Sequence, residues 1–291
     1  MKLGIVHKTT YYYGEQVTTS HHEARLTPRD SHDQRLISHD VAIEPAPDAR
    51  RRRFDYFGNR VLHFSLSEPH RRLEVRTQSV VEVIAPRMPA LQASPPWEQV
   101  RHDLQTDRRR DALDAYAMAL ESEHVAISDE LRQYGTASFS AGRPLLEAVR
   151  DLASRIHADF AYDARATEVS TPLTDVLRLR RGVCQDFAHL AIGCLRARGL
   201  AARYVSGYLL TRPPPGKPRL TGADASHAWF AAFVPQQGWV DFDPTNDVLP
   251  SDEHVSVAVG RDFADVTPIR GVILGGGEHR LEVAVDVRRL E

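Results

Sequence analysis

Three residues that lie far apart in the sequence, Cys184, His227 and Asp243, have the types that thiol-based acyl transfer requires. Cys184 comes two residues after Gly182, where an extended segment is predicted to turn into a helix rich in leucine and alanine. Unpaired amides and the helix dipole at a helix N-terminus stabilise a thiolate. A thiolate becomes a catalytic nucleophile when a base lies within hydrogen-bond reach and a third group orients that base. His227 and Asp243 are the predicted base and orienting group.

The second cysteine, Cys194, is predicted to be a core residue. It lies on an apolar stripe at helical spacing that includes Phe187, Leu190 and Leu195. Free cysteine behaves as a small hydrophobic residue in such a position. Ten residues of helix would separate the two sulfurs by about 15 Å, which exceeds the reach of a disulfide of about 7 Å between Cα atoms. The sequence therefore predicts two free thiols.

A predicted hairpin decides whether His227 and Asp243 can meet, because His227 opens its first strand and Asp243 closes its second. If Val234 paired directly with Trp239, Asp243 would lie opposite Phe230, on the sheet face away from His227. A one-residue slip reverses every side chain. The triad thus requires a shifted or bulged register that brings Asp243 opposite or diagonal to His227.

Other residues could orient the imidazole. Asp241 shares the face of Asp243 in a regular strand, and Asn246 follows shortly after. Taken singly, His227 and Asp243 also fit structural roles, as a half-buried histidine and a turn-capping aspartate. The residue types alone leave these alternatives open.

The elements around these residues indicate an α+β protein. Short β-type runs separated by turns extend from Lys2 to about Val83 and predict an antiparallel sheet domain over 1–86. After a proline-rich stretch, helical patterning predicts a helical linker region over 87–140. The remainder, 141–291, begins with helices and ends with strands, so it is predicted to form a core of helices packed on an antiparallel sheet. The last strand would carry Leu281, Val283 and Val285 on one face of that sheet.

The bulk composition excludes several classes of protein. The 291 residues have a formal net charge of −2, so electrostatics do not favour nucleic-acid binding. The chain contains no apolar run of membrane-spanning length and no secretory signal at its start, and we expect a cytoplasmic protein that does not engage membranes. The histidines and cysteines form no HExxH or CxxC pattern, so neither a metal nor a cofactor is predicted.

The segments "GVCQDFAHL" and "SHAWFAAFVPQQGWVDFDPTN", in this order, resemble the bacterial transglutaminase-like superfamily. Flanking segments extend the resemblance over about 159–272, and the first eighty-odd residues resemble the β-rich domain that often precedes such cores. The resemblance implies a papain-like core and a catalytic triad of Cys184, His227 and Asp243. Gln185 stands where the animal transglutaminases have an aromatic residue after the cysteine, which separates this chain from those crosslinking enzymes.

The implied reaction is acyl transfer from a peptide or protein amide, with hydrolysis favoured slightly over transfer to an amine. The backbone N–H of Cys184 would be one oxyanion donor. Tyr162 and Gln185 are candidates for a second donor, and Trp229 is a candidate substrate contact. A transglutaminase that crosslinks proteins and a catalytically silent interaction module are the alternatives. The sequence does not indicate an oligomeric state.

Overall fold

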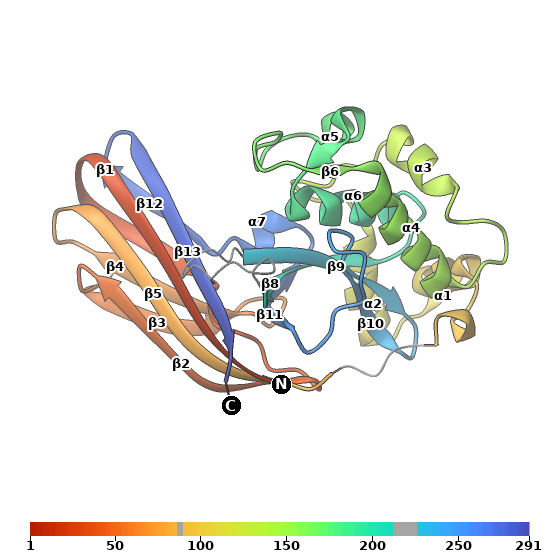
Figure 1. The fold of residues 1–291 in the computed structure, drawn as a ribbon, viewed down its shortest axis with the longest axis horizontal. Helices are drawn as coiled ribbons and strands as arrows, with labels where there is room; N and C mark the ends of the chain where they lie inside the picture. Colours follow the sequence, from red (N-terminus) through yellow and green to blue (C-terminus); the bar gives the residue numbers. More distant parts are fainter. Residues whose placement is uncertain (86–89, 212–225, 291) are drawn as a thin grey trace, which may run out of the picture.

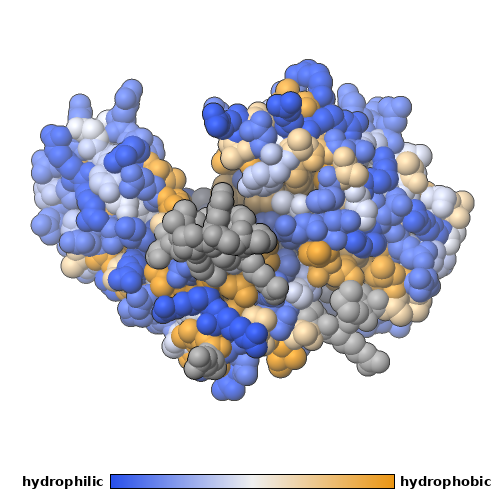
Figure 2. All heavy atoms as spheres, viewed as in Figure 1, coloured by the Kyte–Doolittle hydropathy of each residue, from blue (hydrophilic) through white to orange (hydrophobic). Residues whose placement is uncertain are grey.

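The computed structural model of the chain describes residues 1–85, 90–211 and 226–290, and it has two lobes (Figure 1). One lobe is a twisted antiparallel sheet. The other packs helices against a second, smaller sheet. This arrangement agrees with the predicted α+β class and with the expected order of a β-rich domain followed by a helix-and-sheet core. On the face seen in Figure 2, hydrophilic residues predominate on both lobes, and a notch separates the lobes.

The sheet of the first lobe is built around one long strand, β1, which runs through Lys2–Ala24. Its first half pairs with β5 and β13, and its second half pairs with β4 and β12. A register shift between Tyr12 and Val17 marks the change of partner. The strands of this sheet are β1, β2 (Gln34–Glu44), β3 (Ala49–Phe54), β4 (Arg60–Leu66), β5 (His70–Val83), β12 (Ile269–Gly275) and β13 (His279–Arg289).

The position of β12 and β13 corrects the predicted division into domains. These C-terminal strands were expected in the sheet of the 141–291 core, but they pair with β1 in the first lobe. In Figure 1 the blue C-terminal strands lie beside the red N-terminal strand. Val285 and Val287 are fully buried in a cluster with Leu3 and Ile5. Alternation of apolar residues predicts a strand correctly, but it carries no information about which sheet the strand joins.

The second lobe contains a four-stranded antiparallel sheet in the order β10-β9-β8-β11. Its strands are β8 (Ala202–Leu209), β9 (Ser226–Val234), β10 (Gly238–Phe242) and β11 (His254–Gly260). The helices are α1 (Trp97–Thr106), α2 (Arg110–Tyr116), α3 (Asp129–Thr136), α4 (Leu145–Asp159), α5 (Leu173–Leu179), α6 (Cys184–Arg196) and α7 (Phe263–Val266). Two short strands, β6 (Ala161–Tyr162) and β7 (Arg181–Gly182), pair in parallel beside the start of α6.

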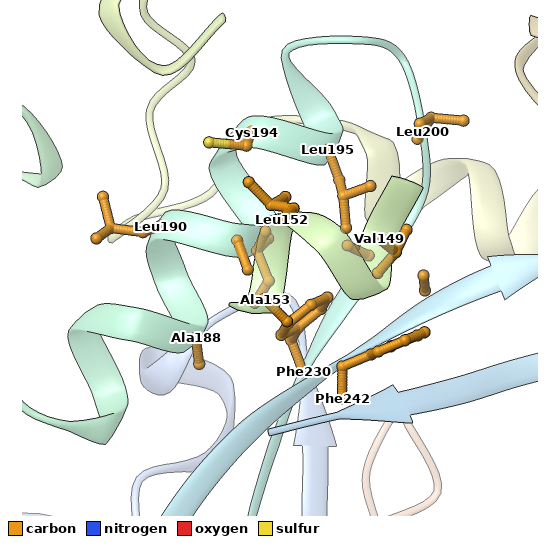
Figure 3. Packing of buried hydrophobic residues seen from close by; sticks show 14 of the residues in the cluster. Val149, Leu152, Ala153, Ala188, Leu190, Cys194, Leu195, Leu200, Phe230 and Phe242 are labelled. Atoms are coloured by element: carbon orange, nitrogen blue, oxygen red, sulfur yellow. The ribbon is translucent and has the colours of Figure 1, made fainter. Parts of the chain in front are cut away.

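Helix α6 lies at the centre of this lobe, and every residue from Asp186 to Arg196 is buried. Phe230 and Phe242 project from the sheet toward the helices, while Leu152 and Val149 of α4 pack against α6 (Figure 3). Most residues of this helix are apolar, and such a helix is stable only when neighbouring elements cover it. Burial therefore holds α6 firmly, and its N-terminal residue has a defined position.

The sequence predicts a helical linker region over 87–140, but in the structure this region is part of the second lobe. Its helices supply Val100, Leu104 and Leu131 to the same hydrophobic cluster as α6. Leu131 also lies directly against Gly193 of α6, where an added Cβ would approach it to 2.9 Å. The prolines near 95 interrupt the local pattern, but the segment beyond them completes the core of the second lobe. Among the described helices, none is long and apolar enough to cross a membrane.

Side-chain amides connect the two lobes along β11. Asn59 donates to the carbonyl of Val259 and accepts from its N–H, both at 2.8 Å. Gln34 makes the same pair of bonds with Ser256, also at 2.8 Å. These two side chains satisfy the backbone of an edge strand much as a neighbouring strand would. The lobes are therefore joined by directional bonds beside the small sheet that carries the candidate site.

Candidate active site

Cys184 is the first residue of α6, and the preceding turn fixes its position. The Asp186 carboxylate accepts from the Val183 N–H at 2.8 Å and from the Thr167 hydroxyl at 2.6 Å. An acidic residue at this place in the first turn caps a helix. Gly182 is required because a Cβ there would lie 2.6 Å from an Asp186 oxygen. The motif "GVCQD" thus holds a half-buried thiol at a capped helix N-terminus.

The N-terminal position also provides a backbone donor. The first N–H groups of a helix have no carbonyl partner within the helix. The Cys184 N–H is one of these, so it can stabilise an oxyanion that forms next to the sulfur. Cys194, ten residues later, is fully buried and free, as predicted.

The hairpin has the register that a triad needs. Trp239 pairs with Phe233, not with Val234, so the ladder is shifted by one residue from the simplest pairing. Continued beyond Phe242, which pairs with Phe230, this register brings Asp243 diagonal to His227. His227 Nε2 lies 2.8 Å from Asp243 Oδ2. Because this bond occupies Nε2, Nδ1 is the ring nitrogen left to interact with the thiol.

Asp243 is fully buried and receives several hydrogen bonds. Besides His227, the Nδ2 of Asn246 donates to Oδ2 at 2.7 Å, and the N–H of Thr245 donates to Oδ1 at 2.9 Å. His254 Nε2 lies 3.2 Å from the same Oδ2. Burial opposes the charge on Asp243, but the bonds from His227 and His254 outweigh it and hold the pKa of the carboxyl well below its usual range. A carboxylate with this many donors remains ionised.

The electrostatics of His227 favour the imidazolium form. Burial lowers the pKa of His227, but the hydrogen bond to Asp243 and the interaction with Cys184 raise it to about 10. At neutral pH the ring therefore holds a proton, and the acid at its far side balances the charge. Cys184 is close enough to act on this ring. The protonated ring can give its proton to a leaving amine and, once neutral, take a proton from an attacking water.

The alternative orienting groups have other positions. Asp241 Oδ2 accepts from the indole N–H of Trp229 at 3.0 Å, and the structure gives it no bond to His227. Asn246 lies 3.3 Å from His227 Nε2 and is bonded to Asp243, so it supports the pair. Of the three candidates, Asp243 makes the shortest contact with the imidazole.

The remaining predicted site residues have different environments. Tyr162 is 60% exposed. The partial loss of water around its phenol, together with the charge of the neighbouring Cys184, raises the pKa of Tyr162. Its phenol is therefore a protonated donor near the sulfur at neutral pH. The Gln185 side chain lies 3.4 Å from the Val169 carbonyl, which directs its amide toward that loop. Trp229 is fully buried with its N–H already donated, so it supports the site from within.

His254 is a site residue that the sequence analysis missed. It begins β11, and its ring meets the ring of Trp229 edge-on at 5.3 Å between centroids. Glycine at position 207 allows this packing, because a Cβ there would lie 2.5 Å from the Trp229 ring. A histidine before an alternating strand has no distinctive local signal. Only the pairing of β11 with β8 brings it to Asp243.

His227, Asp243 and His254 are also the one group in the described part of the chain whose ligand atoms could converge on a metal, all lying within 4.8 Å. A metal ligand must present an unprotonated nitrogen. The pKa of about 10 keeps a proton on His227 at neutral pH, and both imidazoles already share one carboxylate oxygen. The donor set fits a hydrogen-bonded acid–base group better than a metal centre.

The pKa shifts predict a pH-dependent stabilisation by the His227–Asp243 pair. The raised pKa of His227 adds stability fully below 6.5, and this gain is lost as pH rises toward about 10. The lowered pKa of Asp243 adds stability above 3.8, and this gain is lost as pH falls. We expect the difference in Tm between wild type and His227→Ala to be largest between these values, near pH 5 to 6, and to shrink toward pH 10. Thermal unfolding followed by circular dichroism checks this.

The control for this experiment is His32→Ala, since the His32 side chain is 89% exposed. Its Tm should follow that of wild type at each pH. A difference between wild type and His227→Ala that stays constant from pH 5 to pH 10 would contradict the assigned protonation of the ring.

Comparison with known proteins places this geometry in context. Residues 3–82 match the family described as the bacterial transglutaminase-like N-terminal region, and residues 132–244 match the core of the transglutaminase-like superfamily. The second match contains Cys184, His227 and Asp243.

Individual relatives agree with these matches. An uncharacterized protein of Mycobacterium tuberculosis is 45% identical over 97% of this chain and 91% of its own length. A protein-glutamine gamma-glutamyltransferase of Pseudomonas aeruginosa is 32% identical over 43% of this chain and 18% of its own length. A solved structure from Cytophaga hutchinsonii, provisionally described as a cysteine protease, superimposes with a TM-score of 0.78 at 21% identity, covering 100% of this chain and 91% of that one. That likeness shows the fold.

Proposed function

The chain belongs to the transglutaminase-like superfamily, and from this premise we propose that it transfers the acyl group of a peptide or protein amide through a thioester on Cys184. The observation that carries the proposal is the convergence of three elements: the N-terminus of α6, the start of β9 and the end of β10. These elements place the thiol of Cys184 next to the imidazole of His227, and the imidazole next to the buried carboxylate of Asp243. The distance between His227 Nε2 and Asp243 Oδ2 is 2.8 Å.

The reaction proceeds in two halves. The proton of the Cys184 thiol rests on His227, so the sulfur attacks as a thiolate and forms a bond to the amide carbon, while the Cys184 N–H binds the oxyanion. The C–N bond then breaks, and the amine leaves with the proton from His227. Water attacks the thioester while His227 accepts one of its protons, and the S–C bond breaks, which restores the thiolate beside the protonated ring. Asp243 keeps the ring oriented throughout.

Two acceptors are compatible with the thioester, and we rank water first because hydrolysis needs no second substrate site. Transfer to an amine is the second candidate, and the match of 128 residues to a protein-glutamine gamma-glutamyltransferase favours it. Incubating glutamine-containing peptides and peptide amides with and without an added primary amine, and weighing the products by mass spectrometry, separates the two. Hydrolysis adds water to the acyl fragment, whereas transfer adds the amine.

Selective alkylation of one cysteine tests the reactive thiol without a known substrate. Iodoacetamide should modify Cys184 much faster than Cys194 near neutral pH, because Cys184 is half-buried beside an imidazolium and Cys194 is fully buried. Burial raises the pKa of Cys194 to about 12, which leaves almost no thiolate there. Peptide mapping by mass spectrometry gives the rate at each site.

The variant His227→Ala provides the matched comparison. It should slow alkylation of Cys184 and leave that of Cys194 unchanged. Slow labelling of both thiols at equal rates in wild type would instead indicate a protein that keeps the fold without the chemistry.

A further inference from the structure

A cavity of about 600 Å³ lies on the face of the small sheet that points away from α6. Along β8, Ala202 and Tyr204 belong to the core beneath α6, so Arg203 and Val205 project to the opposite face. The segment 29–34 of the first lobe closes the cavity from the other side. This volume is within the range of cavities that hold small molecules. We call it the Arg203 cavity.

Arg203 is the unusual residue of this cavity. Its guanidinium lies over the Trp239 ring, 4.5 Å from the centroid. Its Nε is buried without a hydrogen-bond partner, and within the described chain the side chain makes no ion pair within 4.0 Å, although the charge of Asp241, which also lines the cavity, acts on it from a greater distance. Burial lowers the pKa of Arg203 to about 10, so it remains charged at neutral pH. A guanidinium whose Nε is buried without an acceptor can bind a further anion.

The walls define what kind of anion fits. Trp229, Trp239, Val205 and Val259 supply a flat apolar surface next to the guanidinium. Arginine binds carboxylates through two parallel N–H donors. Asp33 at the rim and Asp241 in the wall repel a multiply charged group such as phosphate, whereas Asp30 is paired with Arg60 at 2.6 Å. A single carboxylate on a flat apolar body satisfies all three features.

The cavity also adjoins the candidate active site. His254 lines it and places Nε2 3.2 Å from Asp243 Oδ2, on the carboxylate that orients His227. Trp229 lies between them and contacts both imidazole rings, with centroid distances of 5.3 Å to His254 and 6.0 Å to His227. A molecule in the cavity would therefore touch two residues that support the triad.

We propose that the Arg203 cavity is an effector site for a small aromatic carboxylate, which Arg203 binds and which changes the reactivity of Cys184 through Trp229 and His254. The site lies on the other side of the sheet from the thiol, and ligand binding there does not depend on the proposed acyl transfer.

Phenylacetate titration followed by tryptophan fluorescence tests binding. Two of the three tryptophans, Trp229 and Trp239, line the cavity, and the third, Trp97, lies on α1. We expect a saturable change with phenylacetate. Binding should be weaker by about tenfold or more for the neutral phenylacetamide and for the variant Arg203→Met, because each loses a charge-assisted bond. Equal binding of the two compounds, or no saturable change, would overturn the proposal.

Two further variants serve as a control and as a fallback for the fluorescence titration. Arg198→Met is the matched control, since Arg198 also lies over an aromatic ring, that of Phe139 at 4.9 Å, but outside the cavity. It should bind phenylacetate like wild type. If Arg203→Met does not fold by circular dichroism, Arg203→Lys keeps the charge without the paired donors and should bind with intermediate affinity.

The effector role is measured by the rate at which iodoacetamide alkylates Cys184. Saturating phenylacetate should change this rate in wild type and leave it unchanged in Arg203→Met. Binding without any change in the rate would overturn the effector role. If Cys184 were unreactive in all conditions, the proposed acyl transfer would fail, while the fluorescence titration would still decide whether the cavity binds a carboxylate.

Discussion

Replacing Cys184 with alanine is expected to lower turnover of a peptide-amide substrate by about 10⁴- to 10⁶-fold, because the nucleophile that forms the thioester is lost. The folded state should change little, since the thiol is half-buried at a helix end and the cap on Val183 is made by Asp186. We expect at most about 1 kcal/mol of lost stability. Product formation by mass spectrometry and chemical denaturation measure the two effects.

Cys194→Ala supplies the opposite control within the same helix. Cys194 is fully buried in the core cluster around α6 (Figure 3), where its Cβ faces Gly135 of α3. Its removal should cost about 1 to 2 kcal/mol of stability and leave turnover near that of wild type. If Cys184→Ala were the less stable variant and Cys194→Ala the inactive one, the assignment of the two cysteines would be reversed.

The second large effect is expected from Asp243→Asn, which should reduce turnover by about 10³- to 10⁴-fold. An asparagine amide cannot stabilise an imidazolium, and its NH2 group faces donors from His227, His254 and Asn246. The pKa of His227 should fall because the bond that raises it is lost. Its titration can be followed by NMR of the ring protons in Asp243→Asn and in wild type.

Asp241→Asn is the matched control, two residues earlier on the same strand. Burial raises the pKa of Asp241, and its carboxylate accepts only from Trp229 among the bonds found in the described chain. Asparagine keeps an acceptor for the indole N–H. The variant should therefore retain most of the activity and leave the titration of His227 unchanged. Equal losses in both variants would mean that the carboxylates act through stability of the sheet, and Asp243 would lose its assigned role.

The corrected domain organisation has a consequence for experiments on parts of the chain. Because β12 and β13 pair with β1, the first lobe is built from both ends of the chain, and the second lobe is formed by the segment between them. A fragment that begins at residue 141 would lack the helices that cover α6 and would expose strands that have lost their partners. Activity measurements should therefore use the whole chain, including its first sheet.

Much of the site could be predicted from local patterns in the sequence. Gly182, Cys184 and the apolar stripe behind them indicate a buried helix that begins at a cysteine, because both features depend on residues within a few turns. The turn residues after Val234 likewise indicate a hairpin. Similarity over "GVCQDFAHL" and the hairpin then identified the family and the order of the candidate residues.

What only the tertiary structure decided was which residues meet across strands. Asp241 and Asp243 have almost the same local context, and a shift of one residue in the pairing of β9 with β10 determines which one can reach His227. The contribution of His254 and the return of β13 to the first lobe also depend on partners more than ten residues away. The alternation of residues along a strand shows which side chains share a face of the sheet. The partner strand and its register are determined by the packing of the whole chain.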